Sequence, residues 1–231
     1  MQVPKTFDID DTLTRAVWRF NFRPDLYVHD SWLKAMPEGE VLQRLLSQRT
    51  TESRLAQYML TRLGVAESVF FDFRSPLSQL ALWGGDDIRQ LVEYIGATLY
   101  RDLVRLVITR EDITRLRHTV GEDLYAFMQQ RAPVLTHKVG NPPVFPGAMP
   151  LKSRMALAGL LCLRAAFQQF PDAFWLRLMF KLEREWYVQW KSHARFGKRW
   201  DTIAGECAVL VQKVAIEIKI GIGRDGKILF N

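Results

Sequence analysis

The sequence has few of the residues from which proteins build disulfide frameworks and metal sites. Its 231 residues include two cysteines and four histidines, with no C-x-x-C and no H-E-x-x-H arrangement. Disulfide-stabilised domains are rich in cysteine, and zinc sites need clustered ligands at short spacing. G-x-S-x-G and Walker loop motifs are also missing. The sequence therefore predicts a reducing compartment, with no metal site, no catalytic residue and no cofactor.

Long apolar runs are missing as well. The longest, Met155 to Leu163, lies between two arginines and is about half the length of a membrane span. Asp8, Asp10 and Asp11 stand where a signal peptide would carry basic and then apolar residues. We interpret these carboxylates as a solvated turn that caps the following helix, with binding of a divalent cation as the alternative. The sequence predicts a cytoplasmic protein that does not insert into a membrane.

One motif near the C-terminus has the spacing of a nucleotide-binding loop. Gly221, Gly223 and Gly226 spell G-x-G-x-x-G, which holds a pyrophosphate only where a strand precedes the loop and a helix follows it. Only five residues follow Gly226, so that context is missing. Alternating apolar residues over 215–220 and an Asp-Gly turn pair favour instead a short C-terminal β-hairpin or extended tail.

Helical periodicity dominates the rest of the chain. Apolar residues at helical spacing predict helices over residues 50–64, 84–107, 122–130, 153–166, 172–190 and about 200–215, with a further helix starting at Thr109. Ser153 is expected to cap its helix, and Phe70 to Arg74 is the internal segment with strand character. The predicted fold is mainly α: a compact multi-helix protein forming one domain, 1–231.

A proline-rich segment interrupts this helical pattern. Five of the ten prolines fall between Ala132 and Leu151, and no regular element is expected to include them. A connection of this length in a compact domain is usually functional or a joint between subdomains. We predict a joint at 133–150. An enzyme with a pocket near this joint stays open as a less favoured function.

A first group of basic residues is a candidate binding surface. The formal net charge is +7. Arg101 and Arg105 lie one helical turn apart, and Arg110, Arg115 and Arg117 follow on the next predicted helix. These arginines fit either a solvated face that is paired with neighbouring carboxylates or a docking patch for an acidic protein partner.

A second group interleaves basic and aromatic residues over 186–200. Aromatic rings beside cations can stack bases and hold phosphates, so a basic nucleic-acid-binding module that uses this segment is the alternative function. Trp186 and Trp190, however, have the i, i+4 spacing of a helix that packs on a core. We favour core-facing rings and a solvated basic side.

Three blocks of residues together resemble a known family. The first, Phe22 to Leu33, reads F-x-P-x-x-Y-x-H-x-x-x-L and contains Pro24, Tyr27 and His29. The second begins at Ile95-Gly96 and continues to Leu124, and the third runs from Met155 to Trp175. The chain resembles the SctK family, also called YscK, MxiK or OrgA, the cytoplasmic adaptors of bacterial type III secretion systems.

The resemblance implies a non-enzymatic adaptor without a cofactor or bound nucleic acid. Such an adaptor joins the cytoplasmic forkhead-associated-like domain of the inner-membrane ring protein to the pod protein of the sorting platform. Its indirect partners are the export ATPase and its stator, and its location is the cytoplasmic face of the inner-membrane apparatus. Pro24, Tyr27 and His29 resemble a turn that leads into a helix, so a structural role and a contact role are both open.

Overall fold

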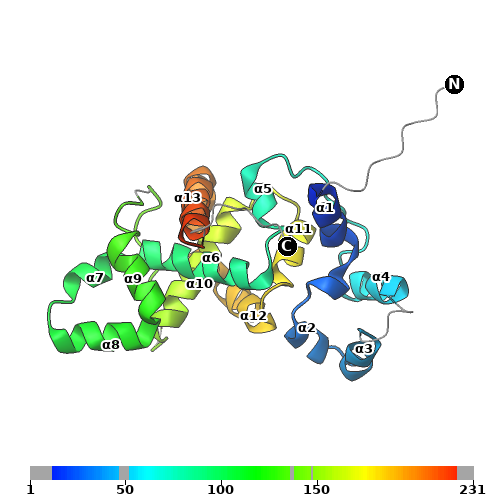
Figure 1. Ribbon diagram of the computed structural model, residues 1–231, viewed down its shortest axis with the longest axis horizontal. Coiled ribbons are helices and arrows are strands. Elements are labelled where there is room, and N and C mark those ends of the chain that lie inside the picture. The colour runs from blue at the N-terminus through cyan, green and yellow to red at the C-terminus, as the bar shows by residue number, and fades with distance from the viewer. Residues whose placement is uncertain (1–11, 47–51, 136–137, 147, 223–231) are drawn as a thin grey trace.

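The computed structural model describes residues 12–46, 52–135, 138–146 and 148–222 (Figure 1). Within these residues the chain forms thirteen α-helices and short 3-10 turns, without any strand, which confirms the mainly α prediction. The α-helices are α1 (Thr12–Phe22), α2 (Asp30–Lys34), α3 (Gly39–Leu46), α4 (Glu52–Arg62), α5 (Pro76–Leu80), α6 (Gly85–Leu99), α7 (Asp102–Leu106), α8 (Arg110–Val120), α9 (Glu122–Gln130), α10 (Leu151–Ala166), α11 (Asp172–Met179), α12 (Arg184–His193) and α13 (Ala204–Ile222).

The centre of the molecule is formed by α6, α10 and α13, which pack against one another (Figure 1). The predicted stripe of α6 is buried along its whole length, from Ile88 to Leu99. Ten of the sixteen residues of α10 are buried, as expected for a central helix. Two glycines let α6 and α10 approach to backbone contact: a Cβ on Gly96 would clash with the Met155 carbonyl, and one on Gly159 with the Val92 carbonyl.

Two groups of helices extend from this centre on opposite sides (Figure 1). The first contains α1 to α4 and the 3-10 turn Pro24–Leu26. The second contains α7, α8 and α9, and α9 packs on α6. The loop between α7 and α8 lies at the far end of the long axis. Exposed residues of the two groups therefore lie on opposite sides of the molecule.

Two helix boundaries predicted from the sequence are confirmed by their capping contacts. The Thr109 side chain accepts a hydrogen bond from the backbone N–H of Asp112 and caps α8. Gly64 follows α4 with a φ of 70°, a left-handed conformation that favours glycine and ends the helix.

Three other helix predictions are wrong, and the first of them, the helix over 84–107, is divided into α6 and α7. Helix α10 starts at Leu151, after an N-cap at Pro150, so Ser153 lies inside the first turn and does not cap it. Proline suits this position because the first turn needs no N–H from it. The predicted helix 172–190 is divided into α11 and α12, and the residues between them include the buried Lys181.

The strand predictions are also wrong. Phe70 to Arg74 forms neither helix nor strand. Residues 215–220 continue α13, because the buried positions Val211, Val214 and Ile218 keep the helical spacing that packs on α6 and α10. Gly221 lies within α13, while Gly223, Gly226 and the second half of the predicted hairpin fall outside the described residues, as do Asp8, Asp10 and Asp11.

The proline-rich segment packs on the main core. Val139 and Phe145 are buried there, and the Trp200 Nε1 donates a hydrogen bond of 3.1 Å to the Val139 carbonyl. The described residues of 133–150 contain no helix or strand. The division of the chain into subdomains at this segment stays a prediction.

Candidate functional site

Four of the five arginines predicted to bind a partner are exposed on α7 and α8. These are Arg105, Arg110, Arg115 and Arg117. Arg101 differs, because its Nη1 donates a hydrogen bond of 2.8 Å to the Leu135 carbonyl. Arg101 therefore fastens the start of α7 to the residues after α9.

Carboxylates lie beside three of the exposed arginines. Arg105 is 3.5 Å from Asp102, Arg115 is 3.5 Å from Asp112, and Arg117 is 3.9 Å from Glu122. Residues 101–120 hold five arginines and three carboxylates, so the segment keeps a positive excess. Ion pairs between exposed groups contribute about 1 kcal/mol or less. Carboxylates of a partner can therefore replace these contacts at little cost.

Two exposed apolar residues stand between these arginines. Leu106 and Ile108 are 75% and 86% exposed in and after the last turn of α7. Arg105 precedes them and Arg110 follows them, and we name these four residues the basic tip. Large apolar side chains beside cations at a protein surface are typical of a protein-binding site.

Sequence reasoning missed the apolar half of the basic tip. Residues 84–107 read as one helix, which would give Leu106 a place on its inner side. The helix instead ends at Leu99, and α7 begins at Asp102 with a new phase. Leu103 and Val107 pack towards the core in that phase, which leaves Leu106 outside.

The family-motif residues make their contacts within the chain. Pro24 is buried and begins the 3-10 turn after α1. The Tyr27 hydroxyl donates a hydrogen bond of 2.9 Å to the Phe20 carbonyl, and burial raises the pKa of Tyr27 well above its usual range. The His29 side chain caps α2 by accepting from the Ser31 N–H. Each residue thus shapes the path from α1 to α2.

Two buried cations behind this motif bind backbone carbonyls. The Arg177 Nη2 donates to the Val65 carbonyl at 2.8 Å. The Lys181 Nζ donates to the carbonyls of Ala81 and Trp83, each at 2.7 Å, and lies 5.4 Å from the centre of the Tyr27 ring. All these partners belong to segments distant in the sequence. The two cations therefore fasten the N-terminal helices and the turn before α6 to α11 and to the turn that follows it.

Burial changes the protonation of this lysine. Desolvation lowers the pKa of Lys181 to about 7, while the Asp87 carboxylate acts in the opposite direction. A lysine with such a pKa can serve as a base in an active site. Its hydrogen-bond acceptors here are carbonyls of the chain itself, so the contacts indicate a structural role.

The aromatic residues of segment 186–200 face the core, as the favoured interpretation expected. Trp200 is 1% exposed, and Trp186, Tyr187 and Trp190 are half-buried against the core. The fixed ring of Trp200 is not accessible for stacking on a base. A cavity of about 340 Å³ lies beside Trp190 and is also lined by Arg164, Lys198 and Asp201. Arg164 is paired there with Asp172 at 2.9 Å.

The described residues hold no group of three histidine, cysteine, aspartate or glutamate side chains that could bind a metal ion. The buried thiols of Cys162 and Cys207 lie on α10 and α13, and they form no disulfide. None of the described helices is both long and apolar enough to cross a bilayer.

Comparison with known proteins identifies a family over most of the chain. Residues 14–215 match the family described as YOP proteins translocation protein K (YscK). A similar fold occurs in the cytoplasmic domain of the type III secretion sorting platform protein PscK from P. aeruginosa. That structure is 22% identical, has a TM-score of 0.52, and the match covers 86% of this chain and 94% of that chain. No curated protein sequence matches the chain.

Proposed function

Since the chain belongs to the YscK family, we propose that it is a non-enzymatic adaptor in the sorting platform of a bacterial type III secretion system. In this role it bridges the cytoplasmic forkhead-associated-like domain of the inner-membrane ring protein and the pod protein. It acts at the cytoplasmic face of the inner membrane, and the export ATPase and its stator are indirect partners. The similarity of its fold to the PscK cytoplasmic domain supports this proposal.

The arrangement of the helices is the observation that supports bridging. The basic tip and the N-terminal helices lie on opposite sides of one packed core (Figure 1). A rigid core that holds two surfaces apart can join two proteins without a change of its own shape. Helices α6, α10 and α13 supply this core, because their side chains form one continuous buried cluster.

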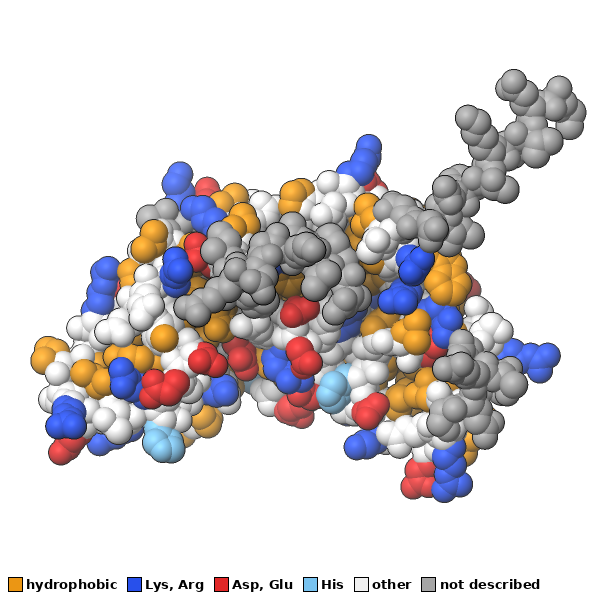
Figure 2. Space-filling model, viewed as in Figure 1, with side chains coloured by type: hydrophobic (Ala, Val, Ile, Leu, Met, Phe, Trp, Pro, Cys, Tyr) orange, Lys and Arg blue, Asp and Glu red, His pale blue; other side chains and the backbone are white. Residues whose placement is uncertain are grey.

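The basic tip is the first proposed contact, and its chemistry suits an acidic partner. Figure 2 shows hydrophobic and basic side chains together at the end of the molecule where α7 and α8 lie. Leu106 and Ile108 can be buried against apolar groups, while Arg105 and Arg110 face carboxylates. Charges of this kind raise the association rate and fix orientation.

A charge reversal tests this contact with purified partners. The double variant Arg105→Glu, Arg110→Glu is expected to lower the affinity for either the ring-protein domain or the pod protein by about tenfold or more. Its matched control is Lys191→Glu, Arg195→Glu, which makes the same change of charge at exposed residues of the 186–200 segment. Isothermal titration calorimetry at two salt concentrations measures the affinities of both variants.

Two results would contradict the proposal. In the first, the wild-type chain binds neither the ring-protein domain nor the pod protein. In the second, it binds random single-stranded DNA with an affinity that falls steeply with salt and that the control variant abolishes. That second result would establish the nucleic-acid-binding alternative.

A further inference from the structure

An exposed group of aromatic rings lies on the N-terminal side of the molecule. Trp18 and Phe22 stand one turn apart on α1, with ring centres 6.2 Å apart, and the Phe71 ring lies 6.2 Å from that of Phe22. Trp18 is 49% exposed and Phe71 is 62% exposed. We name these three residues the aromatic face. From its two outer rings alone, roughly 250 Å² of aromatic surface meets solvent.

The chain around Phe71 is held in place although it forms no helix or strand. Both polar groups of the Asn21 side chain bind the backbone of Phe70, at 2.8 and 2.7 Å. Phe73 is buried, and the centre of its ring lies 5.4 Å from the centre of the Phe20 ring. Phe70 and Phe73 therefore anchor the segment on the core while Phe71 points outward.

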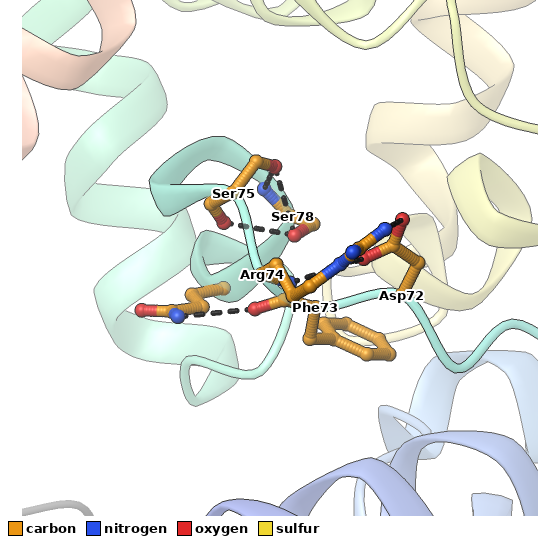
Figure 3. Close-up of polar contacts among 6 residues, drawn as sticks. Asp72, Phe73, Arg74, Ser75 and Ser78 are labelled. Atoms are coloured by element: carbon orange, nitrogen blue, oxygen red, sulfur yellow. Dashed lines mark hydrogen bonds and ion pairs between the residues drawn. The ribbon is translucent and has the colours of Figure 1, made fainter.

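Polar contacts continue this support on the C-terminal side of Phe71. Figure 3 shows Arg74 paired with Asp72, and the Ser75 side chain bonded to Ser78 at the start of α5. The Gln79 side chain donates a hydrogen bond of 3.0 Å to the Phe73 carbonyl. These contacts hold the residues on both sides of Phe71, so the chain that carries its ring is ordered before a partner binds, and a preformed surface loses little entropy on binding.

Cations border the aromatic face. Helix α1 carries Arg15 and Arg19 and no carboxylate, and both arginines are exposed. The Arg23 guanidinium lies 5.8 Å from the centre of the Trp18 ring and pairs with Asp25 at 2.7 Å. Figure 2 shows basic and hydrophobic side chains next to each other on the surface where α1 lies. The net charge along α1 is positive.

We propose that the aromatic face is a second docking surface, which takes an apolar, acidic segment of a partner protein. Aliphatic side chains of that segment cover Trp18, Phe22 and Phe71, and its carboxylates face Arg19. Exposed apolar patches with a polar rim mark protein-binding sites, and tryptophan and arginine are enriched among the residues that dominate binding energy. The inference deepens the proposed function, on which it rests, by supplying the second contact of the bridge.

Charge favours this occupant over a second copy of the chain. In a two-fold symmetric dimer the same patch meets itself. Such a dimer would place Arg19 of one α1 near Arg19 of the other, and α1 itself carries no carboxylate. An acidic partner removes this repulsion and adds attraction.

A crossed experiment separates this surface from the basic tip. The double variant Trp18→Ser, Phe71→Ser is compared with Leu106→Ser, Ile108→Ser, since each removes two exposed apolar side chains. Affinities for the purified ring-protein domain and the purified pod protein are measured by calorimetry. We expect the first variant to lower the affinity for one of them by about tenfold or more, with the other affinity unchanged. The second variant is expected to have the converse effect.

A further variant leaves every ring in place. Arg19→Glu is expected to lower the affinity for the same partner as Trp18→Ser, Phe71→Ser does, with the other affinity unchanged. A loss of folding would lower both affinities. Circular dichroism melts of all variants check that the helices are intact.

The possible failures of the two proposals are distinguishable. If the wild-type chain binds neither protein, the proposed function and this inference both fall. If it binds both, and Trp18→Ser, Phe71→Ser binds both as tightly as the wild type, only the inference is overturned. Loss of self-association or of oligonucleotide binding as the sole effect of that variant would overturn the choice of occupant.

Discussion

Replacing Gly159 with alanine is expected to destabilise the protein by forcing α6 away from α10. The new Cβ would clash with the Val92 carbonyl and lie 2.9 Å from the backbone N of Gly96 and 3.0 Å from the Val92 carbonyl carbon. These atoms belong to the backbone of α6, so no side chain can rotate away. One of the two central helices must shift, and the packing around both is lost in part.

The size of the effect follows from two opposing contributions. Alanine in a helix interior is more favourable than glycine by about 1 kcal/mol. Overpacking a core costs about 1–3 kcal/mol and occasionally more. Because the obstruction is a backbone, we expect the upper part of that range and a net loss of roughly 2 kcal/mol or more. Typical domains are stable by only about 5–15 kcal/mol.

Gly205 supplies the matched control. It lies in the first turn of α13, and a Cβ there would have no atom within 4 Å. Gly205→Ala is expected to leave the stability unchanged or to raise it by up to about 1 kcal/mol. Urea denaturation followed by circular dichroism measures the free energy of unfolding of both variants and of the wild type.

A stability of Gly159→Ala equal to or above that of the wild type would refute the backbone contact between α6 and α10. The core that separates the two proposed binding surfaces would then need a different arrangement. A loss in both variants would instead indicate that glycine itself is needed, for a reason other than helix packing.

Two predictions concern the junction between α11 and the N-terminal helices. Because the pKa of Lys181 falls to about 7 on folding, the unfolded chain binds its proton more tightly between that pH and the usual lysine value. The stability of the wild type relative to Lys181→Met should therefore rise by about 2 kcal/mol from pH 7 to pH 9. Urea denaturation at several pH values measures this difference. A difference that stays constant with pH would disprove the lowered pKa of Lys181. Tyr27→Phe removes the bond to the Phe20 carbonyl and should cost about 1 kcal/mol of stability. Calorimetry should find partner affinity unchanged, whereas a contact role for Tyr27 would lower it.

Local periodicity predicted the centre of the fold. The stripe from Ile88 to Leu99 and the apolar run from Met155 to Leu163 are both buried in helices. A helix that packs along one side repeats its apolar residues every three or four positions, and that pattern is present in the sequence itself. The prediction needed no knowledge of which helices would meet.

Errors arose where distant residues decide the local structure. The break between α11 and α12 contains Lys181, whose hydrogen-bond partners Ala81 and Trp83 lie about a hundred residues earlier. No pattern in the neighbouring sequence indicates such contacts. Residues 215–220 fit both a strand and a helix, and packing of α13 on α6 and α10 selects the helix.

Several residues that carry the family resemblance are not among those proposed to bind partners, although Phe22 belongs to both sets. Pro24, Tyr27 and His29 bind the chain itself, and Gly96 permits the contact between α6 and α10. A motif of this kind identifies the fold, because its residues make contacts within the chain whichever partner binds. The side chains of Trp18, Phe71, Leu106 and Ile108 are instead largely exposed. Substitutions in the motif should therefore lower stability first, and substitutions on the two surfaces should lower affinity while stability is kept.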